Sequence, residues 1–193
     1  MPRQPRKHSV VFLDRDGTLI HDRPGHYLRR PEKLRFYRVT FAAMRLLKKA
    51  GYRLVVITNQ SGIGRGYLSE AMVRRINAHM RRELRRHNAD LDAIYYCPHH
   101  PRERCRCRKP SPLMARRAQR ELGLSFNGAV VIGDKKADVD LGRAIGASTV
   151  LLKTGHGRSQ RQLFGRSIRP SHSAKNILDA ARWVVKNVKR NET

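Results

Sequence analysis

Short apolar runs alternate along the chain with segments in which apolar residues recur every three or four positions. A run that is apolar throughout is typical of a strand buried on both faces of a parallel sheet, and the intervening periodicity is typical of helices that cover such a sheet. The pattern therefore predicts an α/β fold in three layers, a parallel sheet with helices on both faces. The expected strands are residues 9–14, 52–59, 91–97, 129–134 and 148–153.

Capping and turn residues place helices between these strands. Thr40 and Ser111 are candidate N-caps, the second followed by a proline, and a glycine follows the last apolar position of each segment. These signals predict helices at residues 40–51 and 111–123. A longer helix is expected at residues 69–88, where apolar residues four apart mark one side and arginines the other.

The chain after the last expected strand carries a weaker pattern. Residues 155–172 are basic and are interpreted as a mobile loop, and a final helix is expected from about Ser173. His156, at the start of the loop, is a further candidate for a functional site. The expected organisation is a basic N-terminal arm at residues 1–8, a core at residues 9–157, and a basic loop with a C-terminal helix at residues 158–193.

Polar residues end three of the expected strands. Asp14, Thr58 and Asp134 lie at these ends, and Asp16 lies two residues beyond the first of them. Because the carboxyl ends of parallel strands meet at one edge of a sheet, the three aspartates are expected to converge. Carboxylates repel one another unless a proton or a cation lies among them, and oxygen ligands suit Mg²⁺. A turn or cap role would explain one such aspartate more readily than three.

Four motifs occur in chain order, DRDGT (14–18), ITNQSG (57–62), CRKP (107–110) and GDKKAD (133–138). Together they resemble the four motifs of the haloacid dehalogenase-like phosphatases, over about residues 9–157. The resemblance implies a Rossmann-like sheet and a phosphoric monoester hydrolase. In that family pattern Asp14 is the nucleophile, which forms an aspartyl-phosphate, and Asp16 protonates the leaving oxygen and then activates water.

The same resemblance implies the metal and the groups that hold the phosphate. Mg²⁺ would be held by the Asp14 side chain, the Asp16 backbone carbonyl and Asp134, offsetting the repulsion between a carboxylate nucleophile and a phosphate. Thr58 would donate a hydrogen bond to the phosphoryl oxygens. Lys109 would neutralise the charge that spreads over those oxygens.

All three cysteines of the chain lie in the segment CPHHPRERCRC. Cys97 with His99, and Cys105 with Cys107, form two close pairs of soft ligands, which is typical of a tetrahedral Zn²⁺ site. His100 is the rival ligand to His99, and three free thiols beside incidental histidines are the alternative. Four protein ligands leave no open position, so the zinc is expected to be structural and to pin a short arginine-rich loop.

This cysteine-rich segment narrows the resemblance to the branch of the family that acts on heptose bisphosphate and histidinol phosphate, which has short inserts instead of a large cap domain. The NQSG run favours the heptose side, so the implied reaction removes the 7-phosphate of D-glycero-D-manno-heptose 1,7-bisphosphate. Histidinol phosphate or another small phosphate ester is the alternative substrate. The implied substrate-binding residues are Asn59, Gln60, Ser61, Lys135 and Arg108, the last gripping the far phosphate.

The 193-residue chain carries 42 Lys and Arg against 15 Asp and Glu, a formal net charge of +27. Such a charge attracts polyanions, so a nucleic-acid 3′-phosphatase or a nucleic-acid-binding module is a further alternative. Aromatic residues make up only 6% of the chain, which offers few surfaces for stacking bases, and the intact motifs favour a small phosphorylated sugar as substrate. With no apolar run near the ~18 residues of a membrane span and no recognisable signal peptide, we expect a cytoplasmic monomer without a membrane partner.

Overall fold

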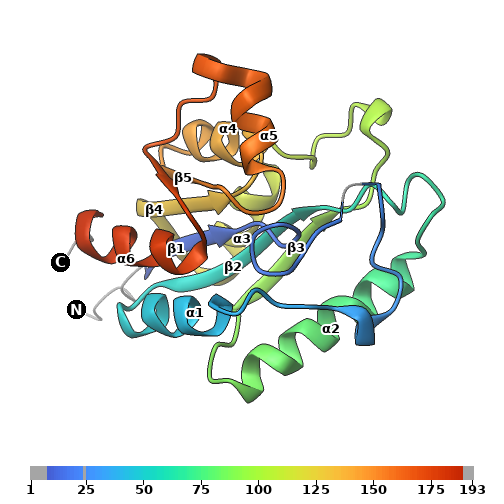
Figure 1. Ribbon diagram of the computed structural model, residues 1–193, viewed down its shortest axis with the longest axis horizontal. Helices are drawn as coiled ribbons and strands as arrows, with labels where there is room; N and C mark the ends of the chain where they lie inside the picture. The colour runs from blue at the N-terminus through green and yellow to red at the C-terminus, as the bar shows by residue number, and fades with distance from the viewer. Residues whose placement is uncertain (1–7, 24, 189–193) are drawn as a thin grey trace.

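One parallel sheet organises the computed structural model, which describes residues 8–23 and 25–188 (Figure 1). Its six strands are β1 (His8–Leu13), β2 (Arg53–Asn59), β3 (Ala93–Cys97), β4 (Leu124–Gly133), β5 (Ser148–Leu152) and β6 (His172–Ala174). They lie in the order β3-β2-β1-β4-β5-β6, so the strand order runs outward from β1 in one direction and from β4 in the other. In such sheets a crevice opens beyond the carboxyl ends of the strands at this switch point.

Helices cover both faces of the sheet. They are α1 (Thr40–Lys49), α2 (Glu70–Arg86), α3 (Leu113–Leu122), α4 (Lys136–Ala144), α5 (Gly157–Phe164) and α6 (Ile177–Asn187). Val11 and Leu13 of β1 are buried in one hydrophobic core with α1, α2 and α6, whereas Val10 and Phe12 are buried in a second core with α3 and α4. The three-layer parallel architecture expected from the sequence is confirmed, and the described residues include no large cap domain.

Two helices begin differently from the sequence-based expectation. Thr40 is already the first helical residue of α1, and its hydroxyl donates to the Leu19 carbonyl at 2.8 Å instead of capping the helix. Pro112 takes the N-cap position of α3, so Ser111 lies one residue before the cap it was expected to provide. The end of α3 agrees with the sequence, because Gly123 adopts the left-handed conformation that terminates helices.

The segment after β5 has more regular structure than its basic sequence predicts. Helix α5 lies within the segment interpreted as a loop, and β6 pairs with β5 as an edge strand. The last helix begins at Ile177, whereas Ser173 belongs to β6. Asn176 fixes this later start, because its side-chain oxygen accepts from the N–H groups of Leu178 and Asp179.

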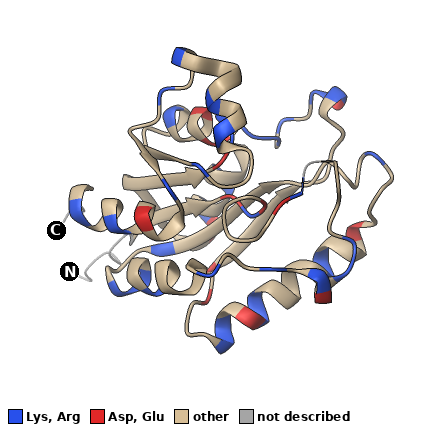
Figure 2. Cartoon of the chain, viewed as in Figure 1, with Lys and Arg blue, Asp and Glu red and all other residues tan. Residues whose placement is uncertain are grey.

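Basic side chains are spread over the molecule. Figure 2 shows Lys and Arg on helices and loops in several parts of the structure, with acidic residues among them. Of the basic arm expected at residues 1–8, only His8, the first residue of β1, lies within the described residues. No helix in the part of the chain that the structure describes is long and apolar enough to cross a membrane. Charge spread in this way does not by itself mark a binding face.

Candidate active site and metal sites

Three buried carboxylates meet where β1 and β4 end. Asp14 follows β1, Asp134 follows β4, and Asp138 lies in the first turn of α4. One oxygen from each carboxylate lies within 4.8 Å of the others, and each residue is at most 5% exposed. The backbone N–H of Asp14 donates to the Ile132 carbonyl at 3.0 Å, which holds the end of β1 against β4. The two strand-end carboxylates therefore lie together, as the parallel sheet requires.

Asp138 is the member of this group that the sequence analysis did not select. Its Oδ2 accepts from the backbone N–H of Lys135 at 3.0 Å, so it caps the start of α4. In the sequence, the available clue was that Asp138 lies four residues after Asp134, in the helix that begins within the motif GDKKAD. An aspartate in a first helical turn ordinarily caps in solvent, and only the fold reveals that this one is 2% exposed.

Lys109 compensates two of these carboxylates. Its Nζ donates to Asp14 Oδ1 at 2.7 Å, to Asp138 Oδ1 at 2.6 Å and to the Ile57 carbonyl at 2.7 Å. Burial alone would lower the pKa of Lys109, but the charges of Asp138 and Asp14 outweigh it and raise that pKa. The pKa of Asp14 is lowered, because the charges of Lys109 and Lys135 outweigh its burial. Asp14 is thus held as a carboxylate, the form required of a nucleophile.

Asp134 has no ion-pair partner among the described residues. Burial, and then the charge of Asp14, raise the pKa of Asp134 to about 8. Its Oδ2 accepts from the backbone N–H of His156 at 2.6 Å, whereas its Oδ1 is buried with no hydrogen-bond partner. Gly17 and Gly155, both with positive φ, approach it so closely that a Cβ on either would fall 2.2 Å from Asp134 Oδ2. The backbone is therefore shaped around this carboxylate, and one of its oxygens is left without a partner.

These features fit a bound Mg²⁺. The orphaned Oδ1 of Asp134 and the ionised Asp14 give a hard cation two oxygen ligands. A cation beside Asp134 would also offset the repulsion that raises its pKa. Asp138, by contrast, already has Lys109 as its counter-charge.

Asp16 lies in a second network, separate from the three buried carboxylates. Both of its oxygens accept from the guanidinium of Arg15, at 3.1 Å each. The Gln60 amide donates to Asp16 Oδ2 at 2.7 Å and to the Thr58 hydroxyl at 2.9 Å. Gln60 is only 5% exposed, so its side chain joins Asp16 to Thr58 instead of lying open on the substrate side as expected from the sequence. The Asp16 side chain remains 20% exposed.

Of the other expected substrate-binding residues at this edge, Asn59 ends β2, Ser61 lies on the loop after β2, and Arg108 lies on the loop after β3. Asn59 pairs with the backbone of Lys109, donating to its carbonyl at 3.2 Å and accepting from its N–H at 3.0 Å. This pairing fixes the backbone of Lys109 against β2. Ser61 is half-buried, and its carbonyl accepts from the Arg65 N–H at 3.0 Å. Arg108 is half-buried, and its Nη1 is buried without a hydrogen-bond partner among the described residues.

Lys135 and His156 share a partner that the sequence analysis missed. The Lys135 side chain is 38% exposed, with its Nζ 3.7 Å from Asp22 Oδ2, and His156 Nε2 lies 3.1 Å from the same oxygen. Burial lowers the pKa of Lys135, but the charges of Asp14 and Asp134 outweigh it and raise that pKa. Asp22 follows no apolar strand and belongs to no motif, so only the tertiary structure reveals its position.

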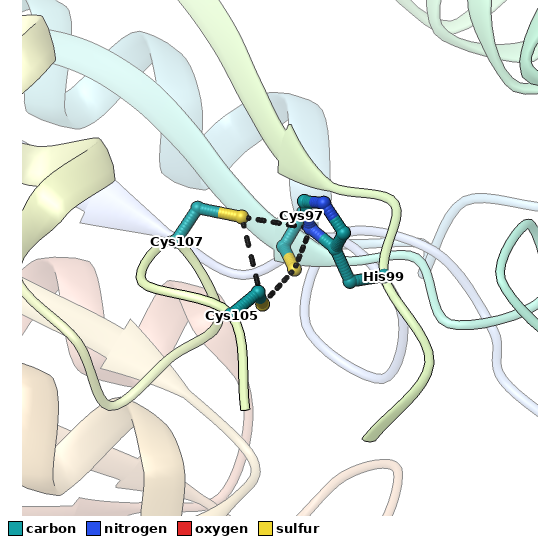
Figure 3. Close-up of side chains that lie close together, drawn as sticks. All are labelled: Cys97, His99, Cys105 and Cys107. Carbon is teal, nitrogen blue, oxygen red and sulfur yellow. Dashed lines mark hydrogen bonds between the residues drawn. The ribbon is translucent and has the colours of Figure 1, made fainter. Parts of the chain in front are cut away.

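A cluster of sulfur and nitrogen ligands lies beyond β3 (Figure 3). Cys97 ends β3, His99 follows it, and Cys105 and Cys107 come from the next loop. Cys97 Sγ lies 3.6 Å from His99 Nδ1 and 3.5 Å from Cys105 Sγ. Cys107 Sγ lies 3.2 Å from His99 Nδ1 and 3.8 Å from Cys105 Sγ. The structure therefore gathers the four expected ligands at one point.

The cluster fits a tetrahedral Zn²⁺ ion. Ligands about 2.0–2.3 Å from a tetrahedral zinc lie roughly 3.3–3.8 Å from one another, close to the 3.2–3.8 Å separations in this cluster. His100 is not a member of the cluster, because its Nδ1 accepts from the Arg102 N–H at 3.1 Å and caps the 3-10 helix η2 (Pro101–Glu103). The donor set and spacing suit a closed zinc site.

Comparison with known proteins agrees with this geometry. A family model described as HAD-hydrolase-like matches residues 106–180. The D-glycero-beta-D-manno-heptose-1,7-bisphosphate 7-phosphatases of Pasteurella multocida (strain Pm70) and Haemophilus influenzae are 41% and 42% identical over 154 and 156 residues, and each match covers 76% of this chain and 83% of the relative. The chain belongs to the haloacid dehalogenase-like phosphatases.

Other members of this phosphatase family match nearly the whole chain. The D-glycero-alpha-D-manno-heptose-1,7-bisphosphate 7-phosphatase of Photorhabdus laumondii subsp. laumondii is 33% identical over 165 residues, which are 81% of this chain and 89% of that protein. The crystal structure of the D,D-heptose 1,7-bisphosphate phosphatase from B. bronchiseptica, complexed with magnesium and phosphate, has a TM-score of 0.84 at 28% identity and covers 92% of this chain and 98% of that one. As a member of the family, this chain is a phosphoric monoester hydrolase.

Proposed function

We propose that the enzyme removes the 7-phosphate of D-glycero-D-manno-heptose 1,7-bisphosphate through an aspartyl-phosphate on Asp14, with Mg²⁺ as cofactor. The observation that carries this proposal is the pairing of Asp14 with Lys109, 2.7 Å apart, beside the orphaned oxygen of Asp134. The pairing provides an ionised nucleophile, and the orphaned oxygen provides a ligand for a cation. The names of the relatives support the choice of substrate.

In the first step, a carboxylate oxygen of Asp14 attacks phosphorus, and the bond between phosphorus and the sugar oxygen breaks. Asp16 in its protonated form gives its proton to that departing oxygen, so that the sugar leaves as an alcohol. Because Asp16 lies two residues after Asp14 on the turn that follows β1, the two carboxyl groups reach the phosphate from different directions.

In the second step, a water molecule attacks the phosphorus of the aspartyl-phosphate, and Asp16, now a carboxylate, takes a proton from that water. The bond between phosphorus and the Asp14 oxygen breaks, which releases inorganic phosphate and restores both carboxyl groups. When bound, Mg²⁺ would be held by the Asp14 side chain, the Asp16 backbone carbonyl and Asp134, and would supply positive charge beside the phosphoryl oxygens.

The remaining residues of the edge bind the substrate. Lys109 and the Thr58 hydroxyl would stabilise the charge on the phosphoryl oxygens, and the contacts of Lys109 with Asp14 and the Ile57 carbonyl support this role. Arg108, with its unpartnered Nη1, would form charge-assisted hydrogen bonds with the second phosphate of a bisphosphate. Lys135, Asn59 at the end of β2 and Ser61 on the loop after it would border the sugar. Zinc at the cysteine cluster would be structural, since its four ligands leave no open position.

The proposal is tested by the ranking of catalytic efficiencies over a panel of phosphate esters with Mg²⁺. The panel contains both anomers of the heptose bisphosphate, histidinol phosphate and a 3′-phosphorylated oligonucleotide. We expect the β-anomer to rank first, because relatives named for it share 41–42% identity with this chain, against 33% for the relative named for the α-anomer. A higher rank for histidinol phosphate or the oligonucleotide would contradict the proposed substrate. We further propose that the enzyme acts as a cytoplasmic monomer.

A further inference from the structure

Arg15 lies between the two aspartates of the first motif, yet its side chain is buried inside the protein. It is 2% exposed and belongs to the largest fully buried side chains of the described residues. Arginine is rarely buried to this extent unless it is paired. We propose that Arg15 is a positioning residue, which fixes the orientation of the Asp16 carboxyl group for proton transfer to the leaving oxygen. This inference rests on the proposed function of Asp16.

The guanidinium of Arg15 grips Asp16 side-on. Nε donates to Asp16 Oδ2 and Nη2 donates to Asp16 Oδ1, each at 3.1 Å. A planar fork that binds both oxygens of a carboxylate fixes the rotation of the carboxyl plane as well as its place, which a single donor does not. Asp16 therefore has a defined orientation although its side chain stays 20% exposed.

Arg15 is itself held by two neutral amides. Its Nη1 donates to Asn77 Oδ1 at 2.8 Å and its Nη2 donates to Gln60 Oε1 at 2.9 Å. Gln60 comes from the loop after β2 and also donates to Asp16 Oδ2 at 2.7 Å, and Asn77 comes from the buried side of α2. The carboxyl group of Asp16 is thus anchored to two elements that lie outside its own loop.

This arrangement is costly if its only role is to hold the fold together. A buried guanidinium loses its hydration, and an apolar side chain of similar size would pack the same space without that penalty. Among the described residues, Asp16 is the one ion-pair partner of Arg15, and that partner is the proposed acid and base. Packing alone therefore does not explain why a buried arginine occupies this position. Its hydrogen bonds orient the carboxyl group of Asp16, which is the proposed reacting group.

A role in proton transfer depends on the leaving group. When an alkyl phosphate reacts, the bond between phosphorus and the alkoxide oxygen breaks while that oxygen takes the proton of Asp16. When p-nitrophenyl phosphate reacts, the departing p-nitrophenolate is stable as an anion and needs no proton. Misorientation of Asp16 therefore slows the first reaction more than the second, whereas a loss of fold or of phosphate binding slows both alike.

The test measures kcat/KM for Arg15→Met with p-nitrophenyl phosphate and with whichever alkyl phosphate the unmodified enzyme hydrolyses best. General acid catalysis contributes about 10²–10⁴-fold, so we expect at least a ~100-fold loss with the alkyl ester and a loss below about 5-fold with the aryl ester. Arg15→Lys keeps the charge but not the fork, and should give a smaller split of the same sign. If Arg15→Met does not fold, Arg15→Lys is the variant used for the test.

Met80→Ala is the matched control, because Met80 is a buried residue of α2 with no hydrogen bond to Arg15. This variant should destabilise the helix without separating the two substrates. Two results would overturn the positioning role. One is an equal loss of kcat/KM on both esters in the Arg15 variants, and the other is a Met80→Ala variant that shows the same difference between the esters. The alkyl ester is chosen by activity, so the comparison of alkyl and aryl esters does not require heptose bisphosphate as substrate. A failure to hydrolyse heptose bisphosphate would contradict the proposed substrate but would not affect the test of Arg15.

Discussion

The ammonium group of Lys109 lies 2.7 Å from Asp14 Oδ1, and both residues are 5% exposed. The lysine comes from the loop after β3, two residues after Cys107 of the Cys/His cluster, and the aspartate follows the end of β1. The ion pair therefore joins two parts of the chain 95 residues apart at the point where the strands end. Its effect is to keep Asp14, the proposed nucleophile, ionised in surroundings that would otherwise favour its neutral form.

Lys109→Met should impair both activity and stability. Without the ammonium group, Asp14 and Asp138 face each other as uncompensated buried charges, and the phosphoryl oxygens lose a donor. We expect kcat/KM to fall by about 10²–10³-fold and the free energy of unfolding of the metal-free protein to fall by about 3–5 kcal/mol. Steady-state kinetics and urea unfolding measure the two effects.

Lys135→Met is the control for the Lys109 prediction. Lys135 contributes charge near the same carboxylates, but its side chain is 38% exposed and makes no hydrogen bond to Asp14 in the structure. The free energy of unfolding should fall much less in Lys135→Met than in Lys109→Met. Equal destabilisation by the two substitutions would contradict the view that the buried pair with Asp14 is what matters.

The affinity for Mg²⁺ should rise with pH up to about 8. Burial and the charge of Asp14 raise the pKa of Asp134 to about 8, so at neutral pH this carboxyl holds a proton that a cation must displace. Because this pKa lies above that of the unfolded chain, Asp134 destabilises the metal-free protein as pH rises from about 4 to about 8, and Mg²⁺ should restore stability most at the upper end.

Titration calorimetry between about pH 6 and pH 9 tests this dependence. Below pH 8 the affinity should increase by up to about tenfold for each pH unit, with proton release on binding, and should then level off. Asp134→Asn should lose most of the binding at every pH. An affinity that does not change over this range would contradict a cation bound to Asp134.

The sequence predicted the parts of the site that follow from strand ends and motif order. Asp14 and Asp134 lie together because parallel strands place their ends at one edge, and the grouping of Cys97, His99, Cys105 and Cys107 was expected from their spacing. Asp138 and Arg15 were missed for a physical reason, since aspartates in first helical turns and arginines ordinarily face solvent. Whether either is buried depends on which distant carboxylates or amides reach it, and local patterns do not contain that information.

The C-terminal segment illustrates a second limit of the sequence. Strand β6 has three residues, His172–Ala174, without an apolar run, so pairing with β5 is what makes it a strand. Helix α5 is flanked by glycines and has mostly polar residues. Phe164 at the end of α5 and Ile168 beyond it pack with Leu151 of β5, which explains why this basic segment folds. Tertiary contacts of this kind override weak local preference.

Replacement of the two adjacent histidines should have different effects on zinc. His99→Ala removes a ligand, so the purified protein should contain much less than one equivalent of zinc and unfold at a lower temperature. His100→Ala should keep about one equivalent, because His100 only caps a short 3-10 helix. Atomic emission analysis and thermal unfolding measure the two outcomes. Full zinc content in His99→Ala, or wild-type protein with activity but little zinc, would contradict a structural zinc site.

Arg108→Ala should distinguish a bisphosphate from a monophosphate. The buried, unpartnered Nη1 of Arg108 is proposed to bind the phosphate that is not cleaved. A hydrogen bond to a charged group is worth about 1.5–3 kcal/mol, so kcat/KM for the heptose bisphosphate should fall by about 10–150-fold. For a small monophosphate, which lacks the second anion, it should change by less than about threefold. Equal losses on both substrates would place Arg108 at the reacting phosphate instead.

The most direct test of the central claim is to identify the residue that carries the phosphoryl group during turnover. Asp16→Asn leaves the first step possible with p-nitrophenyl phosphate but slows hydrolysis of the intermediate, so that the covalent enzyme accumulates. Acid quenching followed by peptide mass spectrometry should find an acyl phosphate on Asp14. Asp14→Asn should be folded, inactive and unlabelled. Phosphate on another residue, or normal turnover by Asp14→Asn, would contradict the account.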